Sequence, residues 1–154
     1  ASALNAGLSQ MRGEFFSWLS HDDEYLPRKI EAQMEFLSRL GREDVVLYSD
    51  FRTIDGESRP LKTHVMPAIA PGEFRIWLTR ESRLHGCTLL VPRLCFERCG
   101  HFDPNLRTTQ DYTLWFRIAK EFPFVRVPEV LVNARIHGNQ GTRSMWGTVL
   151  AECN

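Results

Sequence analysis

The sequence predicts an α/β domain in which short buried strands alternate with amphipathic helices. Apolar runs at 14–19, 44–54 and 87–91 are bounded by polar or turn-forming residues and have the length of strands. Residues 27–40 and 110–122 instead repeat apolar side chains with the helical period over longer stretches. Strands that alternate with helices favour a sheet covered by helices.

The first elements are predicted from proline and glycine positions as well as from the spacing of apolar residues. Residues 2–11 carry apolar side chains at helical spacing, and 14–19 form a short apolar run that predicts a buried strand. Pro27 suits a first helical turn and Gly41 suits a C-terminal cap, so 27–40 form the clearest helix. The side chains expected on its apolar side follow the helical period: Ile30, Met34, Leu37 and Leu40.

The middle of the chain alternates between strand and irregular patterns. Residues 44–54 are rich in β-branched and aromatic side chains, which predicts a strand that ends in the Asp55-Gly56 turn. Residues 57–71 are polar and broken by three prolines, so we expect a long loop. Residues 72–83 carry apolar side chains on one side and predict a short helix.

The C-terminal elements are read in the same way. Residues 87–91 predict a buried strand, and 92–99 a short helix closed by a glycine. Residues 110–122 predict an amphipathic helix that Pro123 stops. The β-branched stretch 124–136 predicts one or two strands. The loop 137–143 and a terminal helix over 145–153 are expected after it.

Composition excludes some classes of function. The 154 residues suffice for one domain with a core, so 1–154 is treated as a single domain. With 19 basic and 19 acidic residues, bulk positive charge cannot attract nucleic acid. No apolar run has the length of a membrane span. The four cysteines form no Cys-x-x-Cys pair, which indicates free thiols in a reducing cytoplasm, with Cys87 and Cys95 in the core.

The stretch 18–27 is the most informative part of the chain. Its apolar beginning leads directly into Asp22 and Asp23, and Pro27 then opens the helix. Acids after a buried strand stand where open α/β sheets bind ligands, and carboxylates bind Mg²⁺ or Mn²⁺ together with phosphates. The alternative is a pair of acids that complements the dipole of the following helix. The spacing alone leaves both interpretations open.

Two further places put reactive side chains at the ends of elements. Asp111 stands at the start of a helix, and Arg135 and His137 follow the last strand. Separately, a carboxylate in a first helical turn is commonly a dipole partner, and a histidine after a strand is commonly a surface or core residue. Their joint occurrence with Asp22 and Asp23 favours a functional site.

The order of these motifs resembles the family 2 glycosyltransferases, which are inverting enzymes with the GT-A fold. Ser-His-Asp-Asp at 20–23 is similar to the family's metal motif, Gln-Asp at 110–111 to the segment with its catalytic base, and Arg-Ile-His at 135–137 to its basic segment. The other segments that match in order are 3–8, 13–16, 46–50, 85–90 and 96–103. The resemblance implies a partial GT-A fold with a mixed sheet flanked by helices.

The resemblance also implies roles on the donor side. Asp22, with Asp23 and His137, would hold a divalent metal, Mn²⁺ or Mg²⁺, against the diphosphate of a nucleotide-sugar. The side chains of Ser20, His21 and Arg135 would bind the nucleotide-sugar itself.

On the acceptor side, Asp111 would be the catalytic base that takes the proton of the attacking hydroxyl. The acceptor would lie near His85, Gly86, Gln110 and Trp115. The implied function is hexosyl transfer with inversion to a saccharide or lipid-linked saccharide, in polysaccharide or lipopolysaccharide synthesis. The implied location is the cytoplasm or the inner face of the membrane.

The chain departs from the family pattern at two site positions. Ser20 replaces the first acid of the usual Asp-x-Asp motif, which reduces the expected metal affinity. Gln110 replaces a glutamate beside the base, so the pKa of Asp111 should be lower than a Glu neighbour would leave it.

The front of the chain is a third departure, because family members begin with strands that bind the nucleotide and this sequence starts after them. We therefore expect weak nucleotide binding by this stretch alone. An exposed sheet edge would favour a homodimer.

Two other functions are consistent with the same residues. A non-catalytic binding module that retains the fold is one alternative, and Ser20 favours it. A metal-dependent phosphohydrolase that uses Asp22 and Asp23 is the other, but it would need further clustered ligands for a second metal.

Overall fold

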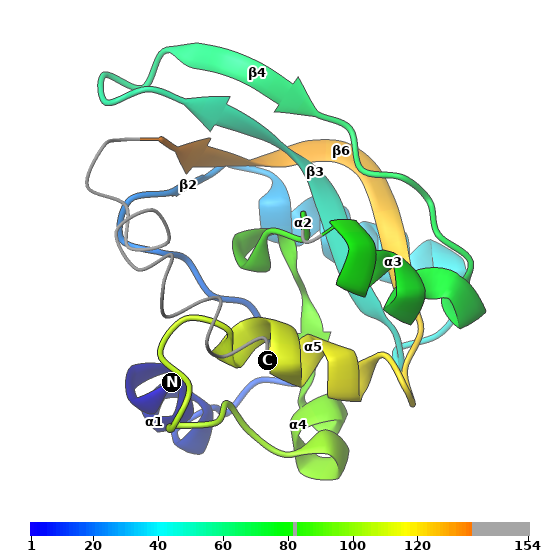
Figure 1. Cartoon of the computed structure of the whole chain (residues 1–154). Coiled ribbons are helices and arrows are strands. Elements are labelled where there is room, and N and C mark those ends of the chain that lie inside the picture. Colours follow the sequence, from blue (N-terminus) through cyan, green and yellow to red (C-terminus); the bar gives the residue numbers. More distant parts are fainter. Residues whose placement is uncertain (82, 137–154) are drawn as a thin grey trace.

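The computed structural model describes residues 1–81 and 83–136 (Figure 1). Its helices are α1 (Ser2–Ser9), α2 (Lys29–Leu40), α3 (Phe74–Glu81), α4 (Arg93–Cys99) and α5 (Gln110–Ile118), with 3₁₀ turns η1 (Pro71–Glu73) and η2 (Gly86–Thr88). Its strands are β1 (Phe15–Phe16), β2 (Glu24–Tyr25), β3 (Val46–Ile54), β4 (Pro60–His64), β5 (Val91–Pro92) and β6 (Phe124–Arg135). The described residues contain no helix long and apolar enough to cross a membrane.

A four-stranded mixed sheet organises the molecule, in the order β2-β6-β3-β4. The central strands β3 and β6 run parallel, from Val46 opposite Phe124 to Ile54 opposite Arg135. The outer strands β2 and β4 are antiparallel to their neighbours. A second sheet pairs β1 with β5, and Leu90 joins it to β3 through a bridge to Leu47. The prediction of a mixed sheet is confirmed.

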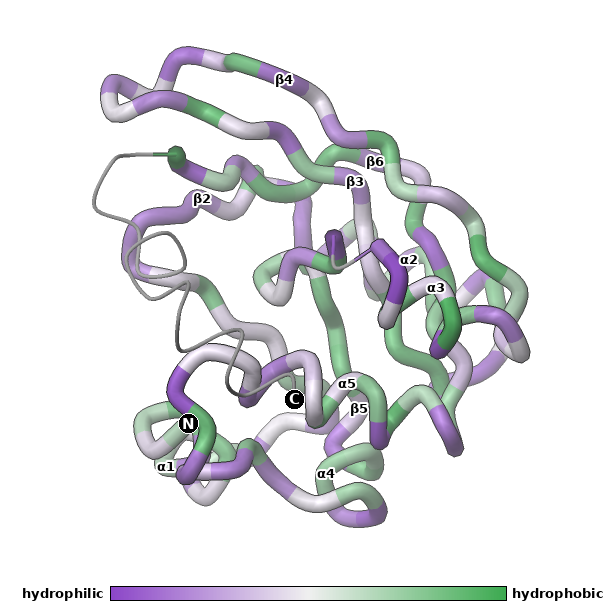
Figure 2. The backbone as a smooth tube through the Cα atoms, viewed as in Figure 1, coloured by the Kyte–Doolittle hydropathy of each residue, from purple (hydrophilic) through white to green (hydrophobic). Residues whose placement is uncertain are grey.

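Alternation along β3 divides the core between the two faces of the sheet. Tyr48 points into a large cluster that α3 and α5 complete with Phe74 and Trp115. Leu47 points the other way, into a smaller cluster that α2 closes with Leu37. Figure 1 shows the four-stranded sheet on one side of the molecule and α1, α4 and α5 gathered on the other. The hydrophobic segment that leads into β5 runs through the middle of the molecule (Figure 2).

Several predicted elements are confirmed, including α1, α2, α3, α4, β3 and β6. Helix α5 ends at Ile118, and a turn continues to Phe122, whose N–H donates to the carbonyl of Ile118. Cys87 and Cys95 are buried free thiols, as expected. The predicted loop 137–143 and the helix over 145–153 lie outside the described residues.

The predicted loop over 57–71 is wrong in part, because it contains β4. This strand pairs with the end of β3, between Phe51 opposite His64 and Ile54 opposite Pro60. All but one of its side chains are exposed, so the sequence shows no apolar alternation there. A proline also begins it, which suits an edge strand.

Two predicted strands are shorter in the structure. Of residues 14–19 only β1 pairs, and of 87–91 the first part forms η2 and only Val91 enters β5. The two-residue strand β2 was not predicted. The apolar segments pack against the core with extended or turn backbone. They are therefore apolar and buried, although few of their residues form strand hydrogen bonds.

The apolar side expected for α2 is also wrong in part. Ile30, Met34 and Leu40 are exposed, whereas Leu37 is buried as predicted. The helix instead buries Lys29, Ala32 and Gln33. This rotation occurs because the two polar side chains find partners in the segment at 88–89, which a count of apolar residues does not register.

Candidate active site

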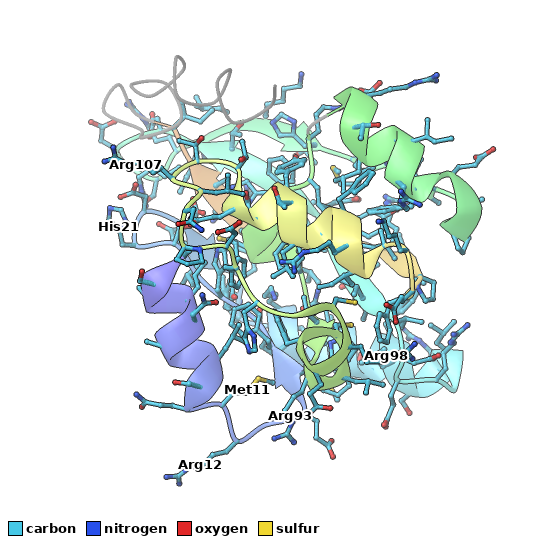
Figure 3. All side chains as sticks on the ribbon, turned by 60° about the horizontal axis from the view of Figure 1, so that its bottom comes forward. Met11, Arg12, His21, Arg93, Arg98 and Arg107 are labelled. Atoms are coloured by element: carbon cyan, nitrogen blue, oxygen red, sulfur yellow. The ribbon has the colours of Figure 1, made fainter. Side chains whose placement is uncertain are left out.

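The loop between β1 and β2 separates its two acids. The N–H of Asp23 donates to the carbonyl of Ser20 at 3.1 Å, which closes a turn over residues 20–23. The Asp23 side chain turns inward and is 7% exposed, whereas that of Asp22 is 30% exposed and lies 3.1 Å from Nε2 of His21. His21 projects from the edge of the molecule (Figure 3). The two neighbouring carboxylates therefore have different environments.

Arg135 at the end of β6 holds this loop against the sheet. Its backbone N–H donates to Oδ1 of Asp23 at 3.0 Å, and its Nε donates to the carbonyl of Asp22 at 3.0 Å. The guanidinium also donates to Oε1 of Glu24 and to the carbonyl of Asp55 in the β3–β4 turn. The predicted basic residue after the last strand thus contacts the predicted metal motif.

Asp23 is part of a partly buried cluster with His85 and Cys87. Its Oδ2 lies 3.2 Å from Cys87 Sγ and 3.7 Å from His85 Nε2. Burial raises the pKa of the Cys87 thiol to about 11, and burial lowers the pKa of His85 although the Asp23 carboxylate opposes this. Near neutral pH the His85 imidazole is therefore neutral and Cys87 keeps its thiol proton. Sequence reasoning placed Cys87 only in the core and missed this contact.

Gly86 lets the η2 turn approach the loop closely. A Cβ at this position would lie 2.5 Å from Cζ2 of Trp18, which is closer than side-chain carbons approach one another. The Trp18 ring in turn lies 5.9 Å from that of Trp115 in α5, measured between ring centroids. The absence of a side chain at Gly86 therefore positions both His85 and Trp18.

Replacing Gly86 by Ala is expected to destabilise the fold by about 1–3 kcal/mol, since overpacking forces neighbouring side chains to move. Urea denaturation would measure it. Gly7→Ala is the matched control, because a Cβ on Gly7 meets nothing within 4 Å. An unchanged midpoint for Gly86→Ala would contradict the close approach of Trp18.

Asp111 begins helix α5 and is partly buried. Its Oδ1 accepts a hydrogen bond from the N–H of Tyr112 at 2.9 Å. Burial raises the pKa of the Asp111 carboxyl above its ordinary value. This desolvation acts against the lowering expected from the neutral neighbour Gln110, whose Oε1 accepts a hydrogen bond from the amino group of Ala1.

The structure places the other predicted site residues in two settings. Ser20 is exposed beside the cluster, with its Oγ 3.5 Å from Cys87 Sγ. Trp115 is fully buried between Trp18 and Phe102, so its ring links α5 to the loop. His137 lies outside the described residues. The loop at 20–23, the η2 turn and the end of β6 are thus brought together, and α5 reaches them through Trp115.

A buried lysine in α2 connects the segment before the loop at residues 20–23 to the segment that follows η2. Lys29 is 1% exposed, and its Nζ donates to Ser17 Oγ at 2.6 Å, Gln33 Oε1 at 2.9 Å and the carbonyl of Leu89 at 3.1 Å. Nζ also lies 4.5 Å from the centroid of the Tyr25 ring. Burial lowers the pKa of Lys29 to about 7. Nothing in the sequence distinguishes this lysine from an exposed one in a first helical turn.

Stability is expected to rise with pH above about 7 because of Lys29. There the folded state has released a proton that the unfolded chain, with a pKa of 10.5, still holds. The free energy of unfolding should therefore increase by about 1 kcal/mol per pH unit between about pH 7 and 8.5. Urea denaturation across this range would measure the slope. Lys29→Met should flatten it, and the exposed Lys62→Met should preserve it. An unaltered slope in Lys29→Met would contradict the assignment.

Comparison with known proteins identifies the relatives of this chain. A family model described as Glycosyl transferase family 2 matches residues 1–103. An uncharacterized glycosyltransferase of Rickettsia prowazekii is 38% identical over 151 residues, covering 93% of this chain and 46% of that protein. The glycosyltransferase TuaG of Bacillus subtilis, named for teichuronic acid biosynthesis, is 26% identical, covering 95% of this chain and 56% of its own. The chain spans about half the length of these relatives.

Solved structures with the same fold include Staphylococcus aureus TarS. One TarS structure aligns with a TM-score of 0.64 at 14% identity, covering 99% of this chain and 27% of that chain. Another aligns with a TM-score of 0.62 at 16% identity, covering 85% and 38%. This likeness confirms the predicted GT-A type of fold.

Proposed function

The chain belongs to glycosyl transferase family 2, and on that premise we propose that it transfers a sugar from a nucleotide-diphosphate donor to an acceptor hydroxyl with inversion. The observation that carries the proposal is the different placement of the two acids in the loop between β1 and β2. Asp23 is turned inward and held by Arg135, while the neighbouring Asp22 keeps a partly exposed carboxylate at the surface. A rigidly held loop with one outward carboxylate suits the binding of a charged ligand.

The carboxylate of Asp22 is a suitable ligand for a hard divalent cation. Mg²⁺ and Mn²⁺ need only one or two carboxylates when waters and substrate phosphates complete the shell. Asp22 would supply that carboxylate, and His137 stays proposed as a further ligand. The carboxylate of Asp23, the other acid of the predicted metal motif, turns inward toward His85 and Cys87. When bound, such an ion neutralises the charge that develops on the departing diphosphate. The exposed side chains of Ser20 and His21 would donate hydrogen bonds to ribose or phosphate.

Arg135 contributes to the donor site by holding it. Its guanidinium donates hydrogen bonds to the carbonyls of Asp22 and Asp55 and to the side chains of Glu24 and Ser58, and it thereby fixes the loop that carries Asp22. The Arg135 side chain is 19% exposed and would also contact a phosphate of the donor. The positive charge would lie close to the diphosphate.

Asp111 would act as the general base. Its carboxylate takes the proton from the acceptor hydroxyl while the hydroxyl oxygen attacks the anomeric carbon of the donor. The bond to the diphosphate breaks on the opposite face, so a single displacement inverts the configuration. Burial makes this carboxylate more basic than an ordinary aspartate, which suits proton transfer. The acceptor would lie between α5 and the η2 turn, near Gln110, His85 and Gly86, with Trp115 fixing the distance between them.

The proposed process is the synthesis of a polysaccharide or a related surface glycan. The name of the relative TuaG supports this, since it refers to teichuronic acid biosynthesis. A saccharide or lipid-linked saccharide is accordingly the proposed acceptor, and a hexose the proposed sugar. The cytoplasmic location and the homodimer expected from the sequence stay predictions.

Nucleoside diphosphate release tests this proposal. The purified full-length protein, given a panel of nucleotide-sugars and saccharide acceptors with Mn²⁺, is expected to release the diphosphate only when an acceptor hydroxyl is present. Asp22→Asn should raise the Mn²⁺ concentration needed for half-maximal turnover by at least about tenfold, because a ligand matters at least as much as the groups that orient it.

Asp44→Asn is the matched control, because Asp44 is exposed, pairs with its near neighbour Arg42 and lies outside the loop at residues 20–23. Donor binding without turnover for every donor in the panel would support the non-catalytic module instead. An unchanged Mn²⁺ requirement in Asp22→Asn would contradict its role.

A further inference from the structure

We propose that Asp23, His85 and Cys87 form a binding site for a thiophilic divalent cation, Zn²⁺, separate from the carboxylate of Asp22. The three ligand atoms all lie within 4.8 Å of one another. They come from two segments that are far apart in the sequence and are brought together by the fold. The inference concerns metal binding alone and does not depend on sugar transfer.

Two of the three separations in the cluster are close to the edges of a tetrahedral zinc site. Bond lengths of about 2.0–2.3 Å to oxygen, nitrogen and sulfur place neighbouring ligand atoms about 3.3–3.6 Å apart. Here Asp23 Oδ2 lies 3.2 Å from Cys87 Sγ and 3.7 Å from His85 Nε2. The two distances that involve Asp23 therefore fit ligands of a shared cation.

The groups around the cluster already orient two of its ligands. The other carboxylate oxygen of Asp23, Oδ1, accepts the backbone N–H of Arg135, which leaves Oδ2 facing the cluster. The Cys87 sulfur accepts the backbone N–H of Ser20 at 3.3 Å, an arrangement that suits a thiolate. Hydrogen-bonded ligands of this kind are characteristic of metal sites, whereas a core cysteine needs no donor aimed at its sulfur.

The chemistry of the ligands selects a soft or borderline cation. Sulfur and imidazole favour Zn²⁺, whereas Mg²⁺ and Mn²⁺ favour oxygen ligands such as Asp22. Three protein ligands leave a fourth position, and the hydroxyl of the exposed Ser20 lies 3.5 Å from the Cys87 sulfur. Binding breaks the S–H bond of Cys87, and its proton passes to solvent.

The alternative is a cluster held by hydrogen bonds alone, in which the thiol donates to Asp23. Cobalt spectroscopy separates the two. The purified full-length protein, stripped of metal by chelation, is titrated with Co²⁺, which reports a sulfur ligand by a near-ultraviolet charge-transfer band and four-coordination by intense visible bands. Zn²⁺ added afterwards should abolish both sets of bands.

Cys87→Ser should lose the charge-transfer band and bind Co²⁺ at least about tenfold more weakly. Cys99→Ser is the matched control, because Cys99 is half-buried and outside the cluster, and it should keep the band. If Cys87→Ser fails to fold by circular dichroism, His85→Gln replaces it and should shift the visible bands. No charge-transfer band in the wild type, or an unchanged band in Cys87→Ser, would overturn the proposal.

Discussion

Replacing Asp111 by Asn is expected to lower kcat by about 10²–10⁴-fold without unfolding the protein, which is the contribution of a positioned general base. The amide keeps the shape of the carboxyl and can still accept the hydrogen bond from the N–H of Tyr112. It cannot take a proton from the acceptor hydroxyl. Initial rates of nucleoside diphosphate release, with circular dichroism of both proteins, would measure the effect.

The pH profile gives this prediction a second readout. Because burial raises the pKa of Asp111, wild-type activity should fall on the acidic side above the pH at which an ordinary aspartate titrates. Asp111→Asn should lose that acidic limb along with the rate. Asp44→Asn, which changes an exposed carboxylate, should keep both. Wild-type turnover in Asp111→Asn would remove the base from the mechanism.

Replacing Arg126 by Met is expected to destabilise the protein by about 3–5 kcal/mol, because it leaves a buried carboxylate without its counter-charge. Arg126 donates to both oxygens of Asp50, at 2.8 and 2.6 Å, and joins the two central strands β3 and β6. The Asp50 side chain is 6% exposed and also accepts the N–H of Met66. Urea denaturation near pH 7 would measure the loss.

The exposed pair between Arg59 and Asp55 provides the comparison. Arg59→Met removes a partner with an exposed side chain, and such pairs contribute about 0–1 kcal/mol. Equal effects of the two substitutions would show that the Asp50 pair is not the stabilising contact that its geometry indicates.

Local patterns in the sequence were sufficient for most of the helices and for the two central strands. Proline and glycine mark the ends of α2, and β-branched residues mark β3 and β6. Strand β4 was not predicted, because its exposed side chains show no alternation of apolar and polar residues. The buried face of α2 was not predicted, because Lys29 and Gln33 are buried with hydrogen-bond partners that lie 60 and 55 residues away in the sequence.

The same distinction applies to the candidate site. The order of motifs predicts Asp22, Asp111 and Arg135 as members of one site, and in the structure Arg135 contacts the loop that carries Asp22. The proximity of Cys87 to Asp23 depends on the close approach at Gly86, which no local pattern reveals. The buried support by Lys29 is likewise a property of tertiary packing.

The anomeric configuration of the product tests the central claim most directly. The full-length protein is incubated with a donor whose anomeric configuration is known, and the configuration of the new glycosidic bond is determined by nuclear magnetic resonance. A single displacement with Asp111 as base predicts a product of opposite configuration to the donor. A product that retains the donor's configuration would contradict the mechanism proposed for this site.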